Sequence, residues 1–487
     1  SNGAPPAQVA SHFWGGPADG KPFTETKVWL SSLSLNYRTD NNLTLSSITG
    51  VYSSSHGAFD NYDLTVFAQA LDAEHDQDTQ ISQELRLASS FSGPVNFTAG
   101  AYYEHDKHDT GDTDKIFALG PYPGPGEFNG DYNTLAMEAH DKAESYSVFG
   151  QVSWKILQEL ELAGGARYTH DTRSAQIGNI FNYFDLIAPT ANPFSPAGVV
   201  YNPSISESNV SPEATLTWHP QNDVTLYGAF KTGYLAGAIG NPANVSNYTL
   251  VTNPNDKFIY KAEKVKGGEL GAKSLLLDDR LSAQLTFYRY EYNNLQVATF
   301  HQENAAFYPG NAGKARSQGV ELEGLFRVDR SLTLNLSLAY TDLKFLEYKG
   351  AQCYPGESVE LCPDGSQDLS GTRYGDGPFT GRFGFSYDHS LWGPVSVRFS
   401  SDVTHTTASP VYERDPLAFT PAYTIVNAAL RFYQTNGPWE LNVIATNLNN
   451  GIYYKNFIFK PLGLPDDIGT QSVSLPRQIT AQVQYRF

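Results

Sequence analysis

The sequence contains little cysteine and no long apolar segment. Only two of its 487 residues are cysteines, and no apolar run approaches the roughly 18 residues that a transmembrane helix needs. This argues against a helical membrane protein. It does not exclude a membrane protein built from strands, because a closed barrel pairs its own backbone groups in lipid while its alternating strands barely register in hydropathy.

Positive charge is scarce as well. Lys and Arg together number 33 against 51 Asp and Glu, which gives a formal net charge of -18. Nucleic acid is therefore not an expected partner, because phosphates bind through Lys and Arg. The excess of carboxylates instead suits exposed loops that face cations or a lipopolysaccharide surface.

Recognisable catalytic motifs are missing. The sequence holds no GxSxG nucleophile elbow, no HExxH zinc motif, no Walker loop and no GxGxxG dinucleotide loop. The scattered His and Ser residues show no spacing that demands a catalytic triad. We therefore predict that the protein is not an enzyme and uses no cofactor.

The chain is rich in aromatic residues and glycine, arranged in alternating segments. Aromatic residues make up 13% of the chain, with 30 Tyr and 28 Phe beside 42 Gly. In the final stretch, 476–487, every second residue from Ile479 onward is apolar and the residues between are polar. A period of two predicts a β-strand with one dry face and one wet face.

One module repeats along the chain: a strand, a tight turn, a second strand and a long polar loop. The pattern predicts about seventeen strands of roughly ten to fifteen residues, enough to cross a bilayer at a tilt. Long loops are predicted over 57–77, 106–141 and 174–206. The predicted strands are 24–38, 43–56, 79–91, 95–105, 142–157, 159–173, 208–219, 223–232, 263–277, 280–292, 315–328, 331–344, 379–389, 394–406, 422–434, 439–448 and 476–487.

The separation of short turns from long loops distinguishes the two folds that alternating strands allow. A soluble sandwich has no reason to sort its connections by length, whereas outer-membrane barrels place short turns at the periplasmic end and long loops outside. We predict an all-β fold, a transmembrane antiparallel β-barrel over residues 24–487. Because bacterial barrels normally have an even number of strands, an odd count with a descending last strand predicts that residues 1–23 are an extracellular loop remnant at a truncated amino end.

Several stretches resemble the barrel of TonB-dependent outer-membrane receptors, and together they cover essentially the whole chain. They are DTQISQELRLAS at 78–89, SPEATLTWHPQNDVTLYGAFKTGY at 211–234, EKVKGGELGAKSLLLDDRLSAQLTFYRYEYNNLQV at 263–297, NAGKARSQGVELEGLFRVDRSLTLNLSLAYTDLKF at 311–345, ELNVIATNLNNGIYY at 440–454 and PRQITAQVQYRF at 476–487.

The resemblance implies a barrel of about twenty-two strands filled by an amino-terminal plug that follows a TonB box. Nothing in this sequence matches the plug or the box. It further implies uptake of a scarce nutrient across a Gram-negative outer membrane, with energy from the TonB complex acting through the plug. A ferric siderophore is the first expectation, ahead of haem, a vitamin or an oligosaccharide.

The same resemblance implies that Phe487, the aromatic carboxyl-terminal residue, is the signal read by the barrel-assembly machine. Outer-membrane lipid and lipopolysaccharide are further partners expected of a barrel in that membrane. Two rival functions remain open: a passive diffusion porin and an outer-membrane hydrolase.

The two cysteines lie in one short loop, CYPGESVELC. We predict a disulfide between Cys353 and Cys362, formed in an oxidising compartment, with two unpaired thiols as the alternative. A zinc site is not expected, because no His or further Cys lies nearby to complete it.

Two acidic clusters could bind a divalent cation through carboxylate oxygens, but neither has the spacing of a defined calcium loop. We favour the interpretation that they belong to solvated extracellular loops. The clusters are Asp72, Glu74, Asp76 and Asp78, and His105, Asp106, His108, Asp109, Asp112 and Asp114.

Other loop residues are candidates for ligand contact. Aromatic rings can stack on a ligand, although many barrel aromatics belong instead to the interfacial girdles. Lys314 and Arg316 could meet an anionic ligand or lipopolysaccharide, or form structural ion pairs. The aromatic candidates are Tyr122, Phe128, Tyr183, Phe184 and Tyr201.

Overall fold

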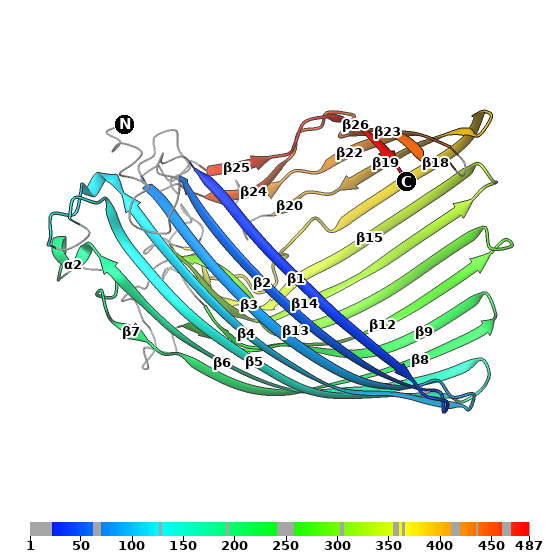
Figure 1. The fold of residues 1–487 in the computed structure, drawn as a ribbon, viewed down its shortest axis with the longest axis horizontal. Coiled ribbons are helices and arrows are strands. Elements are labelled where there is room, and N and C mark those ends of the chain that lie inside the picture. Colours follow the sequence, from blue (N-terminus) through cyan, green and yellow to red (C-terminus); the bar gives the residue numbers. More distant parts are fainter. Residues whose placement is uncertain are drawn as a thin grey trace.

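Seventeen long strands and the two-residue β7 form one 18-stranded antiparallel sheet in the computed structural model (Figure 1). The structure describes residues 22–61, 70–125, 129–190, 194–240, 258–301, 306–353, 360–362, 366–410, 419–434, 437–459 and 469–486. The strands of this sheet are β1 (Phe23–Arg38), β2 (Leu43–Asn61), β3 (Ala70–Ser89), β4 (Val95–Ile116), β5 (Asn133–Lys155), β6 (Leu160–Asn182), β7 (Val200–Tyr201), β8 (Ser204–Gln221), β9 (Val224–Leu235), β12 (Glu263–Leu276), β13 (Leu281–His301), β14 (Ala306–Arg327), β15 (Leu332–Glu347), β18 (Phe379–Trp392), β19 (Val395–Thr406), β22 (Tyr423–Gln434), β23 (Trp439–Thr446) and β26 (Gln478–Tyr485).

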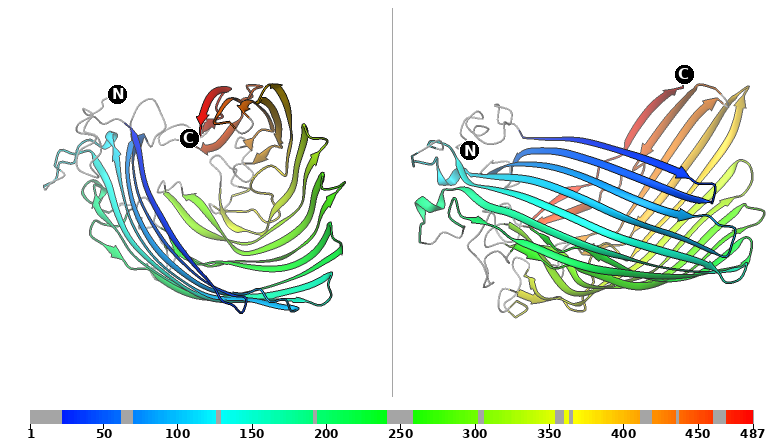
Figure 2. Two further views of the ribbon diagram at one scale, coloured as in Figure 1. Left: turned by 45° about the vertical axis from the view of Figure 1, so that its right-hand side comes forward. Right: turned by 60° about the horizontal axis from the view of Figure 1, so that its bottom comes forward.

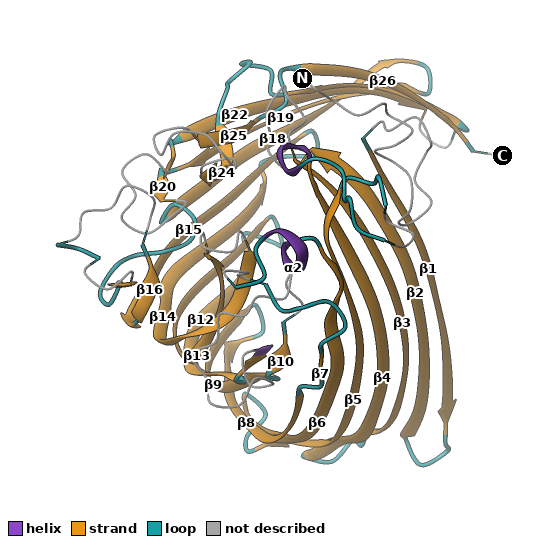
Figure 3. Ribbon diagram, turned by 90° about the vertical axis from the view of Figure 1, so that its left-hand side faces the viewer, coloured by secondary structure: helices purple, strands orange, loops and turns teal. Residues whose placement is uncertain are grey.

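Each long strand pairs with the next long strand along the chain, from β1–β2 through to β23–β26. The sheet curves strongly, so that its face encloses a central space when viewed along the strands (Figures 2 and 3). Within the described residues, β1 and β26 pair with β2 and β23 alone and form the two edges of the sheet. The structure therefore confirms the predicted antiparallel barrel architecture.

The connections divide by length between the two ends of the sheet. Tight turns join the strands at the right-hand end of Figure 1, and longer segments, with the short helix α2 (Phe184–Ile187), lie at the other end. The turns use residues that tolerate a left-handed backbone, such as Asn42 at φ 57° and Asp279 at φ 63°. By the arrangement of outer-membrane barrels, the turn end is periplasmic and the other end extracellular.

The strands extend beyond their predicted limits on the extracellular side. β3 begins at Ala70 rather than 79, β4 continues to Ile116 rather than 105, and β5 begins at Asn133 rather than 142. The loops predicted over 57–77 and 106–141 are therefore wrong for these parts. Above the lipid the outward face of a strand no longer has to be apolar, so the backbone ladder continues without the apolar–polar alternation that identified the strands.

The outward face of the sheet carries a band of exposed apolar and aromatic side chains, the lipid belt, that faces the membrane. On β5 this face exposes Tyr146, Val148, Val152 and Trp154, and the ring of Tyr146 lies 4.9 Å from that of Tyr103 on β4. Tyr146 to Trp154 is nine residues, close to the roughly 9–11 that a tilted strand needs to cross the hydrocarbon core. Residues of β5 before Tyr146 therefore lie outside the membrane on the extracellular side.

The inward face at membrane level is built from tyrosines that lie across glycines. The Tyr227 ring crosses Gly271 of the neighbouring strand, and its Oη lies 3.1 Å from Thr286 Oγ1 one strand further on. Tyr288 crosses Gly319 in the same manner and reaches Thr341 Oγ1 at 2.9 Å. Each tyrosine thus links three strands, which only glycine at the middle strand allows.

Two short hairpins fold against the inward face near the extracellular end. The pair β10 (Ala238–Ile239) and β11 (Ile259–Tyr260) packs with Phe258 against Met137 and Ile177. The pair β16 (Lys349–Gln352) and β17 (Ser366–Asp368) packs against Phe345. Two further pairs complete the described strands: β20 (Ser409–Pro410) with β21 (Phe419–Thr420), and β24 (Tyr454–Phe459) with β25 (Gly469–Val473).

Two other features complete the fold. In the part of the chain that the structure describes, no helix has the length and apolar character needed to span a membrane. The assignment of residues 1–23 to an extracellular loop stays a prediction, because residues 1–21 lie outside the described ranges.

Candidate functional site

Most residues of the two acidic clusters lie on one face of the β3–β4 hairpin, whereas His105 and Asp109 lie on the opposite face. Asp72 pairs with Asp114 and Glu74 with Asp112 in an uninterrupted ladder, and Asp78 pairs with His108. These residues share the face of Tyr102, which lies opposite Ser147 on the inward side of β5. The interpretation that they belong to solvated loops is therefore wrong, since they are strand residues aligned along the inner wall above the membrane.

The inward-facing acidic residues of β3 and β4 form an acidic wall. His108 is the cation at its centre. Its ring lies 3.5 Å from Asp76 and 3.7 Å from Asp141, on the strands at either side. Interaction with Asp141 and then Asp76 outweighs burial and raises the pKa of His108 to about 10. Burial alone would raise the pKa of Asp76, but its bonds to His108 and Thr110 hold the pKa below its usual range. His108 is therefore charged at neutral pH and joins three strands.

The end of the wall is a group of three carboxyl groups. Asp72, Asp112 and Asp114 each offer an oxygen, and these atoms all lie within 4.8 Å of one another. Burial, followed by the neighbouring Asp72, raises the pKa of Asp112 well above its usual range and that of Asp114 to about 8. Three carboxylates at this spacing repel one another unless a proton or a cation lies between them.

A second polar network lines the inward face lower in the barrel, at the level of the lipid belt. Glu269 accepts a hydrogen bond from Tyr290 Oη at 2.5 Å and lies 3.5 Å from Lys231 Nζ. Arg167 donates to Ser147 Oγ and lies over the rings of Tyr102 and Phe149. The sequence analysis missed these residues, although each occupies the polar position between outward apolar ones.

The predicted loop aromatics pack into two clusters at the extracellular end. Tyr122 contacts Phe181 at 5.0 Å and Tyr183 at 5.3 Å between ring centroids, and Tyr183 is buried. Phe184 packs on Phe194 at 5.1 Å. These contacts stabilise the connections that follow β4 and β6, and contact with a ligand stays a prediction.

Tyr201 belongs to the other cluster, around β10 and β11. Its ring lies 5.4 Å from that of Phe258, and its Oη is 2.8 Å from Ser195 Oγ. The structure thus brings Tyr122 and Tyr183 together and places Tyr201 with a different group. Two further candidates, Phe128 and the assembly signal Phe487, lie outside the described residues.

The cysteines and the basic residues have clear structural partners. Cys353 and Cys362 form a disulfide with Cα atoms 6.1 Å apart, in the connection between β16 and β17. Arg316 Nη2 lies 2.7 Å from Asp342 Oδ2, whose carboxyl group also meets Arg373, and Lys314 Nζ lies 4.0 Å from Glu347. Arg316 therefore takes the ion-pair role that the sequence left open.

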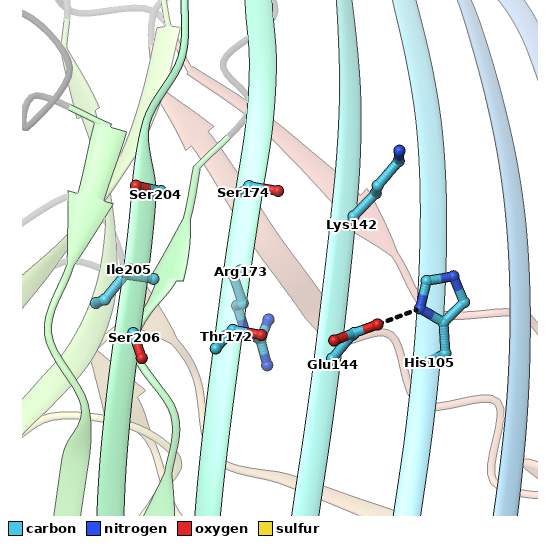
Figure 4. Close-up of a pocket in the computed structure, with 9 residues that line it drawn as sticks. All are labelled: His105, Lys142, Glu144, Thr172, Arg173, Ser174, Ser204, Ile205 and Ser206. Atoms are coloured by element: carbon cyan, nitrogen blue, oxygen red, sulfur yellow. Dashed lines mark ion pairs between the residues drawn. The ribbon is translucent and has the colours of Figure 1, made fainter.

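A polar hollow of about 370 Å³ lies beside β4, β5, β6 and β8 (Figure 4). His105 and Glu144 form an ion pair at its edge, 3.5 Å apart, and Lys142 extends next to them. These three residues share the outward face with Tyr146 and lie just above the lipid belt. Most of the side chains that line the hollow are polar or charged, and Ile205 is the apolar one. Its lining residues are His105, Lys142, Glu144, Thr172, Arg173, Ser174, Ser204, Ile205 and Ser206.

Known proteins share this architecture. Residues 2–450 match the family model described as TonB dependent receptor-like, beta-barrel. A pesticin receptor of Yersinia enterocolitica is 24% identical over 281 residues, which cover 54% of this chain and 36% of the relative.

Solved structures agree in fold. The ferric yersiniabactin uptake receptor of Yersinia pestis superposes with a TM-score of 0.74 at 15% identity, covering 96% of this chain and 62% of that one. A siderophore receptor of Acinetobacter baumannii gives a TM-score of 0.68 at 16% identity, covering 96% and 65%.

These comparisons define both the extent and the class of the chain. It spans about a third of the length of the curated relative and somewhat under two thirds of the structural neighbours. The family match covers nearly all of the chain, and the neighbours are transport receptors rather than enzymes. The chain therefore belongs to the TonB-dependent receptor β-barrel family and is a protein of the Gram-negative outer membrane.

Proposed function

We propose that this barrel is the membrane-spanning part of a receptor that takes up a ferric siderophore with energy delivered by TonB. The observation that carries the proposal is the family match over residues 2–450. The names of its relatives support the substrate class, since they include receptors for ferric yersiniabactin and for a siderophore. The active step requires a plug inside the barrel, and the polar inward wall offers a surface for one.

The inward face of the barrel is suited to contact with a plug that can be rearranged. At membrane level it presents hydroxyl and charged groups, among them Tyr290, Glu269 and Arg167, rather than a continuous apolar surface. Polar contacts that exchange readily with water allow a plug to be rearranged at modest cost. An apolar inward face would instead hold the plug by burying apolar surface, as the core of a domain does.

We also propose that this chain contacts lipopolysaccharide and the barrel-assembly machine. Lys142 and Lys314 are exposed, and Lys142 lies on the outward face just above the belt at Tyr146. Such lysines can meet the phosphates of lipopolysaccharide. Recognition of the chain by the barrel-assembly machine through Phe487 is proposed on the family resemblance alone.

Growth under iron limitation tests the proposal. A strain lacking the gene for this chain should fail to grow on one ferric siderophore as its iron source, and the restored gene should rescue growth. A tonB deletion in the intact strain should abolish growth on the same chelate, because the uptake step needs TonB. Growth of the tonB mutant at the normal rate would indicate a passive porin. Normal growth of the gene deletion on every ferric siderophore supplied would remove this substrate class.

A further inference from the structure

The outward face of β12, β13, β14 and β15 changes from apolar to basic just above the lipid belt. Leu270, Phe287, Val320 and Tyr340 pair in one row across the four strands, and the side chains of Leu270, Phe287 and Tyr340 are exposed. The same face then carries charged side chains in the next two rows toward the extracellular end. The basic ones, called the basic patch below, are Lys266, Arg289, Arg316 and Lys344, with Arg373 bridged to Lys344.

Positive charge is concentrated in this one sector of the sheet. The two rows of the basic patch contain only two carboxylates, Glu291 and Asp342, whereas in the whole chain Asp and Glu number 51 against 33 Lys and Arg. The outward faces of β4 and β5 above their own tyrosines are instead mixed, since Lys107 and Lys142 lie beside rows that hold Asp109 and Glu144. The basic patch therefore presents an excess of positive charge that the chain as a whole does not have.

The carboxylates of the two rows hold the guanidinium groups in place without exhausting them. Asp342 lies 2.7 Å from Arg316 and 2.8 Å from Arg373, and Glu291 lies 2.9 Å from Arg289. A guanidinium group has five N–H donors, so each of these arginines keeps donors for a further ligand. The remaining two cations, Lys266 and Lys344, form no ion pair among the described residues.

The place of the basic patch favours a lipid over a soluble anion. Arg373 Nη2 donates to the hydroxyl group of Tyr340 at 3.4 Å, which puts the cations directly at the edge of the lipid belt. An amphipathic molecule whose acyl chains lie on the belt would bring its headgroup to these side chains. Arginine binds phosphate through two parallel N–H donors, and basic clusters at a membrane surface bind anionic headgroups.

We propose that the basic patch binds a phosphate group of lipopolysaccharide. This inference deepens the lipopolysaccharide contact proposed above by assigning it to named residues on β12–β15, and it rests on the outer-membrane location of the barrel. It does not depend on the siderophore or on TonB, so the binding test below can fail while the growth test succeeds, and the reverse.

Lipopolysaccharide binding by the purified receptor in detergent tests the basic patch. With EDTA present to remove bridging cations, fluorescently labelled lipopolysaccharide should bind saturably, and lipopolysaccharide stripped of its phosphates should bind roughly tenfold more weakly or less. Lys266→Gln and Lys344→Gln should each weaken binding about fivefold, because a lysine near an anionic lipid surface contributes about 1 kcal/mol. Neither substitution breaks an ion pair of the described residues, so both variants should fold.

Lys273→Gln is the matched control. Lys273 lies on β12 like Lys266, but on the inward face, where its Nζ is 5.6 Å from the centre of the Tyr227 ring. This variant should bind lipopolysaccharide like the unaltered protein, and the heat-modifiable gel mobility of each variant reports whether its barrel is folded. The proposal is overturned if phosphate-free lipopolysaccharide binds as tightly as the intact molecule, or if Lys266→Gln and Lys344→Gln both bind like the control. Displacement by inorganic phosphate at concentrations close to that of the lipopolysaccharide would assign the patch to a soluble anion and would equally overturn it.

Discussion

Tyr227 and Thr286 are hydrogen-bonded across an intervening strand, with 3.1 Å between Oη and Oγ1. The tyrosine ring spans Gly271, whose strand separates the two residues. Tyr288, Gly319 and Thr341 repeat the arrangement on the next strands. The inner wall of the barrel is thus held by side chains that each stabilise three strands, and glycine at the central strand is what makes the crossing possible.

Replacing the central glycine should weaken the barrel. A Cβ atom at Gly271 would lie 2.3 Å from the Tyr227 ring, so Gly271→Ala must displace the ring and break its bond to Thr286. We expect a loss of about 1–3 kcal/mol in the free energy of unfolding, measured by urea titration of the barrel in lipid vesicles. Gly324→Ala is the control, because its nearest neighbour would be Leu336 Cβ at 3.9 Å. Equal effects of the two substitutions would contradict this account.

A lysine on the lipid-facing belt should lower the free energy of unfolding far more than a lysine on the inward face of the barrel. Val148 is 57% exposed on the face between Tyr146 and Trp154, so Val148→Lys places an ammonium group in hydrocarbon. We expect a loss on the order of 2 kcal/mol in the free energy of unfolding in vesicles. Gln151→Lys, on the inward face beside Glu213, should change it by less than about 0.5 kcal/mol, because the charge meets a carboxylate and water. A reversed order would show that the assignment of the two faces is wrong.

The stability of the extracellular wall should depend on pH through His108. Its pKa is raised to about 10 in the fold, so its contribution is complete below the ordinary pKa near 6.5 and is lost as the pH rises toward 10. The pKa of Asp76 is lowered, so its contribution is present above its usual value near 3.8 and is lost as the pH falls through the lowered pKa. The thermal midpoint of the unaltered protein should therefore decrease as the pH is raised from 6.5 to 10.

His108→Gln tests this pH dependence. The variant should have a lower midpoint than the unaltered protein at pH 6.5, and the difference should shrink as the pH approaches 10. His170→Gln is a suitable control, because the His170 ring contacts Ser208 on the outward face. A difference that stays constant from pH 6.5 to 10 would argue against a charged His108.

Cys353 and Cys362 should form a disulfide in the native protein. Cys353 and Cys362 close the connection between β16 and β17, in a compartment that favours disulfides. A maleimide reagent applied to non-reduced, denatured protein from the outer membrane should label neither residue, and prior reduction should expose both. Ready labelling of both residues without reduction would remove the disulfide.

Prediction from sequence succeeded where the signal was local. The periplasmic turns agree with their predicted places because Asn42 and Asp279 carry the backbone chemistry of a turn in their own side chains. The final strand, β26, lies within the predicted range 476–487 because that stretch shows a period of two. Residues above the membrane were assigned to loops because that period disappears where the outward face of a strand no longer meets lipid.

The acidic wall shows why the site itself escaped prediction. Asp72 and Asp114 are separated by more than forty residues, and no pattern in either stretch refers to the other. Their proximity depends on the register of β3 against β4, which the tight turn near residue 92 sets and the whole hairpin propagates. The aromatic candidates were likewise assigned to loops without any signal that Tyr183 would be buried against Tyr122.

The amino-acid sequence by itself determined the number, order and direction of the long strands, because alternation and turn chemistry act over a few neighbouring residues. Only the tertiary structure decided which side chains meet. Ladder register placed Asp114 opposite Asp72, and the curvature of the sheet brought Phe258 onto Met137 and Ile177. Such contacts join residues that are distant along the chain, so they follow from how the hairpins align and not from any one segment.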